Sequence, residues 1–476
     1  MKPVVALFLL TLLAVTGALP AATAQRVRTA LNMPLLGRWK DANPAVFYND
    51  IWGYAANGRE YAIMGSSTGT NFIDVTNPAQ PRRVDYVEGR ISTGAVWRDY
   101  KTYAHYAYGV ADGWGGNSLQ VFDLQYLPDS VHLVYDSDTL SVSAHTCFIE
   151  GERLYLVNNK RFWAAPYGDC DILSLADPTR PRYLATITLP QNVVNTGGHA
   201  LMARRDTLFF SGGYGGIFVY DARNPLAPTL IKRFGDQSGG IYNHTAWTTT
   251  TNKLLVMEEE VPTGRPLQVF DMSDMTAPRF VSSFNTVGGA TPHNQFFVQD
   301  RYLVSSWYQD GGQVGDLQNP ATPTRVGYYD TFPDNDSTNV PGSGLGYDGY
   351  KGCWGAYPYL PSGNILSSDI THGLFVNTPP YAVLGVRADQ APATTLASVW
   401  PNPATGTVRL TLGRPAQRVT VEVLNALGQR ACPALAHTLA GRDALTVSLA
   451  EVPAGVYFLR VAADGGTPVV RRLVRQ

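Results

Sequence analysis

The chain has 476 residues, of which 45% are hydrophobic and only 16% charged, and it is rich in Gly (46), Pro (32) and Tyr (26). This composition favours many short strands joined by turns over long charged helices. The formal net charge is −1, and no basic run with interleaved aromatic residues is present, so we expect no nucleic-acid partner.

Residues 1–24 are typical of a secretory signal peptide. Lys2 provides a positive start, residues 4–15 form an apolar run, and Ala22 and Ala24 are the small residues that precede a cleavage point. The apolar run is too short for a good transmembrane span, and no other stretch is long enough. We therefore expect no transmembrane helix in the mature chain. An uncleaved anchor is the alternative reading of this segment.

One pattern recurs between residues 33 and 376: apolar-x-apolar-Asp-apolar-x-Asn/Asp-Pro-x-x-Pro, as in NFIDVTNPAQP around Asp74. The Asp or its equivalent stands at positions 74, 123, 174, 221, 271, 316 and 369, in steps of 49, 51, 47, 50, 45 and 53. A period near 50 residues with four short strands in each unit is typical of propeller blades. We predict one all-β propeller of about seven blades over residues 25–380. Six or eight blades are the alternatives, because the second unit is irregular.

The repeat also predicts two local features. The Asp that precedes each Asn-Pro can accept hydrogen bonds from backbone N–H groups of the turn that follows, which is a structural role. The last unit lacks an outer strand, whereas the segment Met33 to Lys40 resembles an outer strand and precedes the first unit. We therefore expect the N-terminal segment to complete the last blade and close the ring.

The third-strand sequences FIDV, VFDL and FVYD resemble the LVIVD repeat. Together with the segment Trp354 to Val376, they make residues 30 to 376 similar to the choice-of-anchor B family of exported bacterial proteins. The resemblance implies a propeller at the cell surface whose C-terminal anchor varies between members. It implies no reaction.

Four histidines recur at the repeat period, at the start of the first strand of successive units. They are His145, His199, His244 and His293. First strands line the channel of a propeller, so these imidazoles would form an arc at one mouth. The equivalent position is Asp50 in blade one, Trp97, Arg98 or Asp99 in blade two, and Cys353 or Trp354 in blade seven. Converging imidazoles can bind Zn, Cu or Fe, and an ion with an open position could activate water. The alternative is a structural role that the repeat alone explains, in which each histidine forms a hydrogen bond with the backbone of a neighbouring blade.

The loops between second and third strands reach the same face of a propeller. In or near them lie aromatic and acidic residues, namely Trp114, Trp163, Tyr214, Tyr308, Glu258, Glu259 and Glu260. Such residues near a channel mouth suit glycans, peptides or small ligands. Ordinary surface loops, however, carry the same residue types.

The segment 330–350 is a long insertion that contains Asp334, Asp336 and Asp348. Oxygen ligands this close together can hold Ca²⁺, but the spacing differs from that of a twelve-residue calcium loop. A solvated loop is the preferred interpretation. The four cysteines show no CxxC motif, and although export is compatible with one disulfide, we predict no particular pair.

The C-terminal part begins with a linker at residues 381–396, and alternating short strands then predict a small Ig-like β-sandwich over residues 397–476. Its motifs are WPNPATG, VEVLNALGQ, LAEVPAGVYFLRV and a terminal RRLVRQ. In this order they resemble the type A sorting domain of the type IX secretion system. The matching motif residues are Pro401, Asn402, Pro403, Gly428, Gly455 and Tyr457. The resemblance implies a partnership with that machinery, transport across the outer membrane, and removal of the domain by proteolysis.

The sequence thus favours an exported binding or interaction module, at the cell surface or released, with an unidentified protein or glycan ligand. No nucleophile elbow, Walker loop or HExxH motif is present. The alternatives are a metal-dependent hydrolase, lyase or oxidase that uses the histidine arc, and a structural component of the envelope. No cofactor is required by the sequence; a transition metal at the arc and Ca²⁺ in the insertion are the two candidates.

Overall fold

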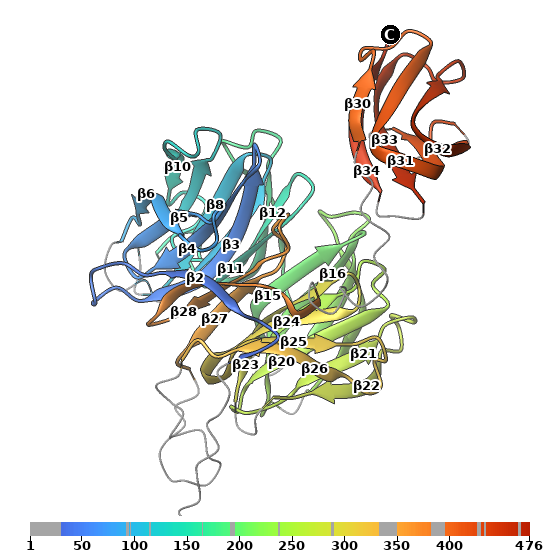
Figure 1. Ribbon diagram of the computed structural model, residues 1–476. Coiled ribbons are helices and arrows are strands. Elements are labelled where there is room, and N and C mark those ends of the chain that lie inside the picture. The colour runs from blue at the N-terminus through green and yellow to red at the C-terminus, as the bar shows by residue number, and fades with distance from the viewer. Residues whose placement is uncertain are drawn as a thin grey trace, which may run out of the picture. The chain divides into compact units, whose positions relative to one another are not determined.

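The structure is a computed structural model, shown in Figure 1. It describes residues 30–91, 95, 97–113, 116–163, 165–190, 196–236, 239–286, 290–332, 350–381, 396–425, 430–432, 435–464 and 468–476. The chain divides into two compact units between Pro380 and Tyr381. The predicted signal peptide and the three aspartates of the insertion lie outside the described residues.

The first unit consists of antiparallel blades of four strands, which we number one to seven in chain order; blades four and five are joined into one sheet by the pairing of Gly213 with Asn243. Blade one contains β3 (Tyr48–Ala56), β4 (Arg59–Ser66), β5 (Gly69–Asp74) and β6 (Arg82–Glu88). Blade two contains β7 (Trp97–Tyr103), β8 (Tyr106–Asp112), β9 (Leu119–Asp123) and β10 (His132–Ser137). Blade three contains β11 (Thr146–Glu150), β12 (Arg153–Asn159), β13 (Gly168–Ser174) and β14 (Arg182–Ile187). Blades four and five contain β15 (Thr196–Arg204), β16 (Thr207–Gly213), β17 (Ile217–Asp221), β18 (Thr229–Phe234); and β19 (Tyr242–Thr248), β20 (Leu254–Val261), β21 (Leu267–Asp271), β22 (Arg279–Phe284).

Blade six contains β23 (Pro292–Val298), β24 (Tyr302–Trp307), the short 3₁₀ helix η1 (Tyr308–Asp310), β25 (Gly311–Asp316) and β26 (Thr324–Tyr329), with β1 (Ala30–Leu31) added at its edge. Blade seven contains β27 (Cys353–Tyr357), β28 (Ile365–Asp369), β29 (Gly373–Asn377) and, as its fourth strand, β2 (Leu35–Trp39).

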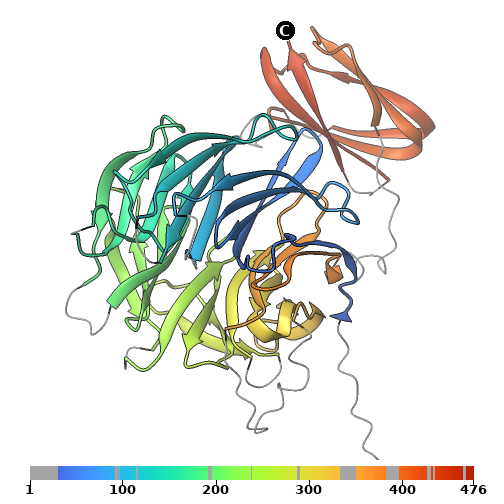
Figure 2. The ribbon, with the colours of Figure 1, turned by 90° about the vertical axis from the view of Figure 1, so that its left-hand side faces the viewer.

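The first strands form a closed ring. Each first strand contacts the first strand of the next blade, and β27 of blade seven contacts β3 of blade one. In Figures 1 and 2 the dark blue N-terminal strands accordingly lie beside the orange strands of blade seven. The part of the chain that is described therefore forms a seven-bladed propeller, as predicted.

The strand β2 closes the ring by pairing with β29, with Leu35 opposite Asn377 and Trp39 opposite Leu374. This pair carries a register shift between Leu35 and Gly37. A shift of the same kind occurs between the third and fourth strands of all six other blades. The N-terminal segment therefore takes the geometry of a regular fourth strand, and the predicted closure is confirmed.

The repeated Asp has the structural role that the pattern predicts. In blade one, Asp74 Oδ1 accepts a hydrogen bond of 2.9 Å from the backbone N–H of Thr76. The same bond, from the residue two positions on, recurs at Asp123, Asp221, Asp271, Asp316 and Asp369. In blade three, the hydroxyl of Ser174 replaces the carboxylate and accepts from Ala176 at 3.2 Å. The turn therefore requires an acceptor rather than a charge.

The core of the propeller lies between the blades, where strands rich in Phe, Tyr, Val and Leu pack face to face. Phe209, Phe210 and Phe218 of blade four are fully buried. All four cysteines of the chain are free thiols, and Cys147, Cys170 and Cys353 are buried.

The second unit is a five-stranded antiparallel sheet built of β30 (Leu396–Trp400), β31 (Thr407–Leu424), β32 (Leu435–Ser448), β33 (Gly455–Ala463) and β34 (Val469–Arg475). The two long strands β31 and β32 pair along both of their halves. Buried and exposed residues alternate along β33, so one face forms a separate apolar core. The all-β class is as predicted, and the Ig-like assignment of this unit stays a prediction.

Asn402 of the WPNP motif ties the start of this unit to its last strand. Its side-chain oxygen accepts from Val474 N at 2.8 Å, and its amide nitrogen donates to Arg472 O at 2.8 Å. Tyr457 is buried, whereas Gly428 lies outside the described residues. The motif residue Asn402 thus has a structural reason to be an amide, because it both donates and accepts.

The closing strand is tightly packed at Gly37. A Cβ at this position would lie 2.1 Å from Pro78 O and 2.9 Å from Pro81 Cδ. We expect Gly37→Ala to lower the free energy of unfolding by about 1–3 kcal/mol, because backbone atoms must move to admit the methyl group. The matched control is Gly168→Ala, whose Cβ would meet only Asn159 O at 3.6 Å. Urea denaturation of the mature chain measures both, and equal stability of the two variants would contradict this account of the closure.

Candidate functional site

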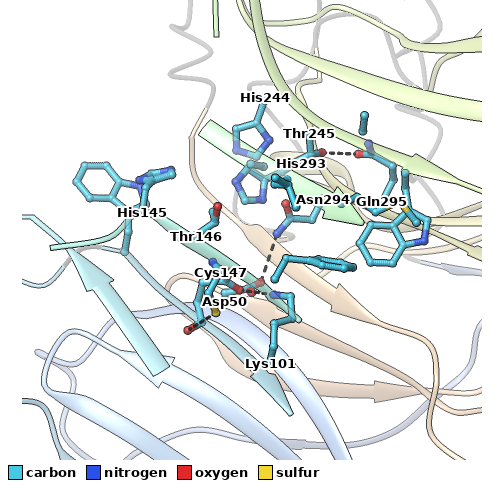
Figure 3. A pocket seen from close by; sticks show the side chains of 18 of the residues that line it. Asp50, Lys101, His145, Thr146, Cys147, His244, Thr245, His293, Asn294 and Gln295 are labelled. Atoms are coloured by element: carbon cyan, nitrogen blue, oxygen red, sulfur yellow. Dashed lines mark hydrogen bonds and ion pairs between the residues drawn. The ribbon is translucent and has the colours of Figure 1, made fainter. Parts of the chain in front are cut away.

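The candidate site is a pocket of about 80 Å³ at the mouth of the central channel. Its walls come from the first strands of all seven blades, β3, β7, β11, β15, β19, β23 and β27. Figure 3 shows histidines on one side of the pocket and the acidic and basic residues Asp50 and Lys101 on the other.

The structure brings the four predicted histidines together in one row. The ring centroids of His145 and His199 lie 4.3 Å apart, those of His199 and His244 4.1 Å, and those of His244 and His293 4.3 Å. The rings are therefore in contact with one another. The channel of the seven-bladed propeller is therefore narrow enough for the four rings to meet. Their role as metal ligands stays a prediction.

Three of these histidines are oriented through Nδ1. His199 Nδ1 lies 3.0 Å from His244 O, His293 Nδ1 lies 2.6 Å from Trp354 O, and His145 Nδ1 lies 3.0 Å from Asp112 Oδ2. A carbonyl oxygen can only accept, so Nδ1 of His199 and His293 carries the proton and Nε2 has a free lone pair. The contacts of His199 and His293 are the backbone bonds that repetition predicts, whereas His145 bonds a carboxylate; contacts of both kinds also orient metal-binding imidazoles.

The histidine side of the pocket favours neutral rings. Burial lowers the pKa of His199 and His244 well below the ordinary value, and neighbouring imidazoles lower it further. For His293, burial and then His244 lower the pKa to about 3. These side chains therefore stay unprotonated at neutral and mildly acidic pH, which is the state that binds a metal ion.

Two glutamates of β20 approach His244 from either side. Glu258 Oε2 lies 2.5 Å from Nδ1, and Glu260 Oε2 lies 3.9 Å from Nε2. Glu258 Oε2 and His244 Nδ1 are this close without the angles of a hydrogen bond. Burial raises the pKa of Glu258 well above its usual value, as do the charges of Glu260 and Glu259. A cation at Nε2 would favour the state with the proton on Nδ1 and an ionised Glu258.

Glu260 is held in place by Tyr308. The buried Tyr308 hydroxyl donates to Glu260 Oε1 at 2.7 Å, which leaves Oε2 on the side of His244. One ligand atom each of His199, His244 and Glu260 lies within 4.8 Å of the other two. Among the described residues, these three form the group that has the composition and spacing to hold a metal ion.

A second charged cluster lies across the pocket, where Lys101 Nζ contacts Asp99 Oδ1 at 2.6 Å. Asp50 is hydrogen-bonded to Asp99, and its Oδ1 accepts from Asn294 at 3.3 Å. Burial, and then the charge of Asp99, raises the pKa of Asp50. Burial opposes the ionisation of Asp99, but Lys101 and hydrogen bonds from Asp50 and Cys147 N lower its pKa. The cluster is therefore a neutral acid, a carboxylate and an ammonium, all buried.

An aromatic layer closes the pocket below. Trp247 lies 4.7 Å from Phe296 and 5.9 Å from Phe148 between ring centroids, and Trp52 lies 6.3 Å from Phe296. Phe148 and Trp247 also line a second cavity beyond the layer. The two cavities share Lys101, Phe148 and Trp247, so the aromatic layer lies between them.

Other predicted residues lie around this site. Arg98 is buried and donates to Ser66 O at 2.9 Å and Ile91 O at 3.2 Å, so it joins blades one and two. The Tyr214 ring lies 5.0 Å from Tyr242, which itself lies 5.3 Å from His199. Trp114 lies outside the described residues.

Several residues of the site escaped the sequence analysis. Asp99 was among the predicted candidates of blade two, but Lys101, two positions further along β7 and also lining the pocket, was missed, although the period-two alternation was present in WRDYKTY. The same period-two alternation gives the three consecutive glutamates of β20 different partners. Glu258 and Glu260 approach His244, whereas the intervening Glu259 binds Arg265 and Gln268, each at 2.6 Å.

Comparison with known proteins identifies the second unit. Residues 398–476 match the family described as a secretion system C-terminal sorting domain. This domain indicates export to the cell surface or outside by type IX secretion, as predicted. Among the described residues, no helix has the length and apolar character to span a lipid bilayer. No curated protein matches the chain.

Solved structures that resemble the chain have low sequence identity. The β-propeller domain of Swd1 from Myceliophteria thermophila is 10% identical with a TM-score of 0.49, covering 73% of this chain and 99% of that one. A protein from Bacteroides uniformis, provisionally described as a 6-phosphogluconolactonase, is 10% identical with a TM-score of 0.48, covering 84% and 99%. A protein of the same description from Bacteroides fragilis is 12% identical with a TM-score of 0.46, covering 72% and 96%. The fold assignment rests on the strand pairing described above.

The buried histidines predict acid sensitivity of the metal-free protein. They stay neutral when folded but take up protons below about pH 6.5 when unfolded, so the unfolded state gains protons as the pH falls. At pH 5 each costs about 2 kcal/mol of stability relative to pH 8. Asp50 and Glu258, with raised pKa, act in the opposite sense, so the total change between the two pH values is smaller.

Substitution isolates the contribution of one histidine. Urea denaturation of His293→Gln at pH 8 and pH 5 is expected to show about 2 kcal/mol less acid destabilisation than wild type. His132→Gln, on the exposed outer strand β10, is the matched control and should follow wild type. Identical pH dependence in the two variants would refute a neutral, buried His293.

The acidic cluster predicts unequal effects of two isosteric changes. Asp50→Asn replaces a group that is already neutral and should change the free energy of unfolding by less than about 1.5 kcal/mol. Asp99→Asn leaves the ammonium of Lys101 buried without a counter-charge and should cost about 3–5 kcal/mol. Urea denaturation at pH 7 measures both. Equal losses, or a larger loss for Asp50→Asn, would show that the proton is on the other carboxylate.

Proposed function

We propose that the chain is an exported propeller that binds a transition-metal ion at the mouth of its channel and acts as a binding module at or beyond the cell surface. The observation that carries this proposal is the group of His199, His244 and Glu260, with ligand atoms within 4.8 Å of one another. The resemblance of residues 30 to 376 to LVIVD-repeat proteins of the choice-of-anchor B family is consistent with display outside the cell. Export would begin with the signal peptide at residues 1–24.

The donor set supports a transition metal rather than Ca²⁺ or Mg²⁺. Imidazole nitrogens with one carboxylate suit Zn, Cu or Fe, whereas the harder ions take oxygen ligands. Around a tetrahedral zinc ion, ligands at about 2.0–2.1 Å from the metal lie about 3.4 Å from one another. The 3.9 Å between His244 Nε2 and Glu260 Oε2 is about 0.5 Å wider, an adjustment within reach of a side chain.

The surroundings of the group also support this assignment. His199 is oriented by a backbone carbonyl, Glu260 by Tyr308, and His244 has a buried carboxylate at Nδ1. Partners of this kind fix the direction of ligand lone pairs and strengthen imidazole as a donor. His145 and His293 flank the group in the same row and can contribute a further nitrogen.

A metal-dependent enzyme is the second candidate, and one observation favours it. Asp50 lines the same pocket as His145, His244 and His293, so an acid that can give or take a proton faces the metal side. An ion with an open position lowers the pKa of bound water, which a hydrolase or lyase requires, and Cu or Fe would permit an oxidase. Catalysis would need both the ion and Asp50, whereas binding needs the ion alone.

Metal analysis tests the proposal. Elemental mass spectrometry of the mature chain, after dialysis without chelator, is expected to find about one Zn, Cu or Fe per chain. His244→Ala and Glu260→Gln each remove a ligand and should lower the affinity for Zn²⁺ at least tenfold. His132→Gln should keep the wild-type content. A wild-type protein without a tightly held transition metal, or one in which His244→Ala loses no metal, would refute the proposal.

A further inference from the structure

An exposed aromatic surface lies on blade three, on the loop between β12 and β13. Phe162, Trp163 and Tyr167 expose 61%, 63% and 49% of their surface. We call these three residues, together with Lys160, the blade-three platform. Large aromatic side chains gathered at the surface of a protein mark a binding site more often than chance exposure does.

Two of the platform rings contact neighbouring segments of the propeller. The Trp163 ring approaches the backbone of blade two, since a Cβ on Gly116 would lie 3.4 Å from its Cζ2 atom. The Tyr167 hydroxyl lies 3.5 Å from Ser143 Oγ, at the opposite end of the loop. Rings that are held at an edge or at a hydroxyl leave their faces available to a ligand at little cost in side-chain entropy.

The platform also carries a cation without a counter-charge. Lys160 Nζ lies 5.8 Å from the ring centroid of Trp163 and 5.5 Å from that of Tyr167. No carboxylate among the described residues lies within 4.0 Å of this ammonium. The adjacent Arg161 differs, because it forms an ion pair of 2.8 Å with Asp171. An anionic group of a ligand would thus meet Lys160 between two aromatic faces.

We propose that the blade-three platform binds a polysaccharide that contains carboxylate-bearing sugars. A sugar ring presents C–H groups on one face and hydroxyls at its edge. The partly positive C–H groups suit the negative face of Trp163 or Tyr167, and a ring carboxylate would pair with Lys160. Export places the platform where such polymers occur.

The loop backbone is poorly suited to a peptide. Strand addition requires a row of unpaired backbone groups, but Phe162 O already accepts from Ala165 N at 2.9 Å, and Pro166 has no N–H. Recognition at the platform must therefore use the faces of side chains. Stacking on sugar rings uses those faces.

The platform is connected to the histidine pocket but uses other residues. Tyr167 contacts Ser143, Ser143 donates to Asp112 Oδ1 at 2.8 Å, and Asp112 Oδ2 bonds His145. The two sites are therefore joined through three consecutive side-chain contacts. Binding to the platform is independent of the metal proposal, because none of its residues belongs to the metal group.

Isothermal titration of the mature chain with polygalacturonate tests the inference. Methyl-esterified polygalacturonate has the same backbone without most of its charge and should bind at least tenfold more weakly. Trp163→Ala and Tyr167→Ala should each reduce binding of polygalacturonate at least tenfold. Lys160→Gln should abolish the preference for the charged polymer and most of the dependence on salt.

The control is Phe280→Ala, which removes an aromatic side chain of similar exposure (54%) from the outer strand of blade five. This variant should bind as wild type does. Equal binding by Trp163→Ala and Phe280→Ala, or absence of polygalacturonate binding by wild type, would overturn the proposal. A further outcome would also overturn it: the wild-type chain forms dimers, Trp163→Ala abolishes them, and the polymer has no effect on dimer formation. The platform would then be a contact surface for a second copy of the chain.

Discussion

Pairing of β2 with β29 turns a linear series of repeats into a closed ring, and every feature of the candidate site depends on that closure. The first strands of blades one and seven contact each other, and the N-terminal segment supplies the fourth strand of blade seven. Without it, the channel would have an open side, and water would reach the buried acid of Asp50 and the buried charges of Asp99 and Lys101. Closure also covers a free sheet edge that would otherwise be available for pairing with another chain.

The repeat determines where the side chains of the site lie, and the residues that differ from blade to blade determine its chemistry. Blades three to six place a histidine at the same point of the first strand, so their rings meet in a row. Blades one and two place Asp50 and Asp99 near that level, and blade seven places Trp354. The pocket therefore has a side of neutral nitrogen donors and a side with a proton-sharing acid pair, although the backbone around it is nearly symmetric.

The spacing of the repeat was sufficient to predict the blade number, the closing strand and the turn acceptors, since each depends on a local pattern within one unit. Ser174 illustrates this, because its hydroxyl performs the same hydrogen bond as the Asp of the other blades. The row of histidines was predictable for the same reason. The contact of Glu260 with Tyr308, and that of Asp50 with Asp99, join residues of neighbouring blades that lie about one repeat apart, but the repeat pattern does not specify these residue types or that their side chains meet. Such pairs depend on the side-chain directions within the closed ring.

The free thiols have a consequence for the conditions under which this protein can exist. Many exported proteins rely on oxidoreductases to join their cysteines before they are stable, and they unfold when a reductant restores the thiols. Here all four cysteines are free, and Cys147, Cys170 and Cys353 are buried within the propeller. The propeller is held together by its closing strand and its packing between blades, so its folding is indifferent to the redox potential around it. Such a protein is as stable in anaerobic, sulfide-rich surroundings as in oxygenated water.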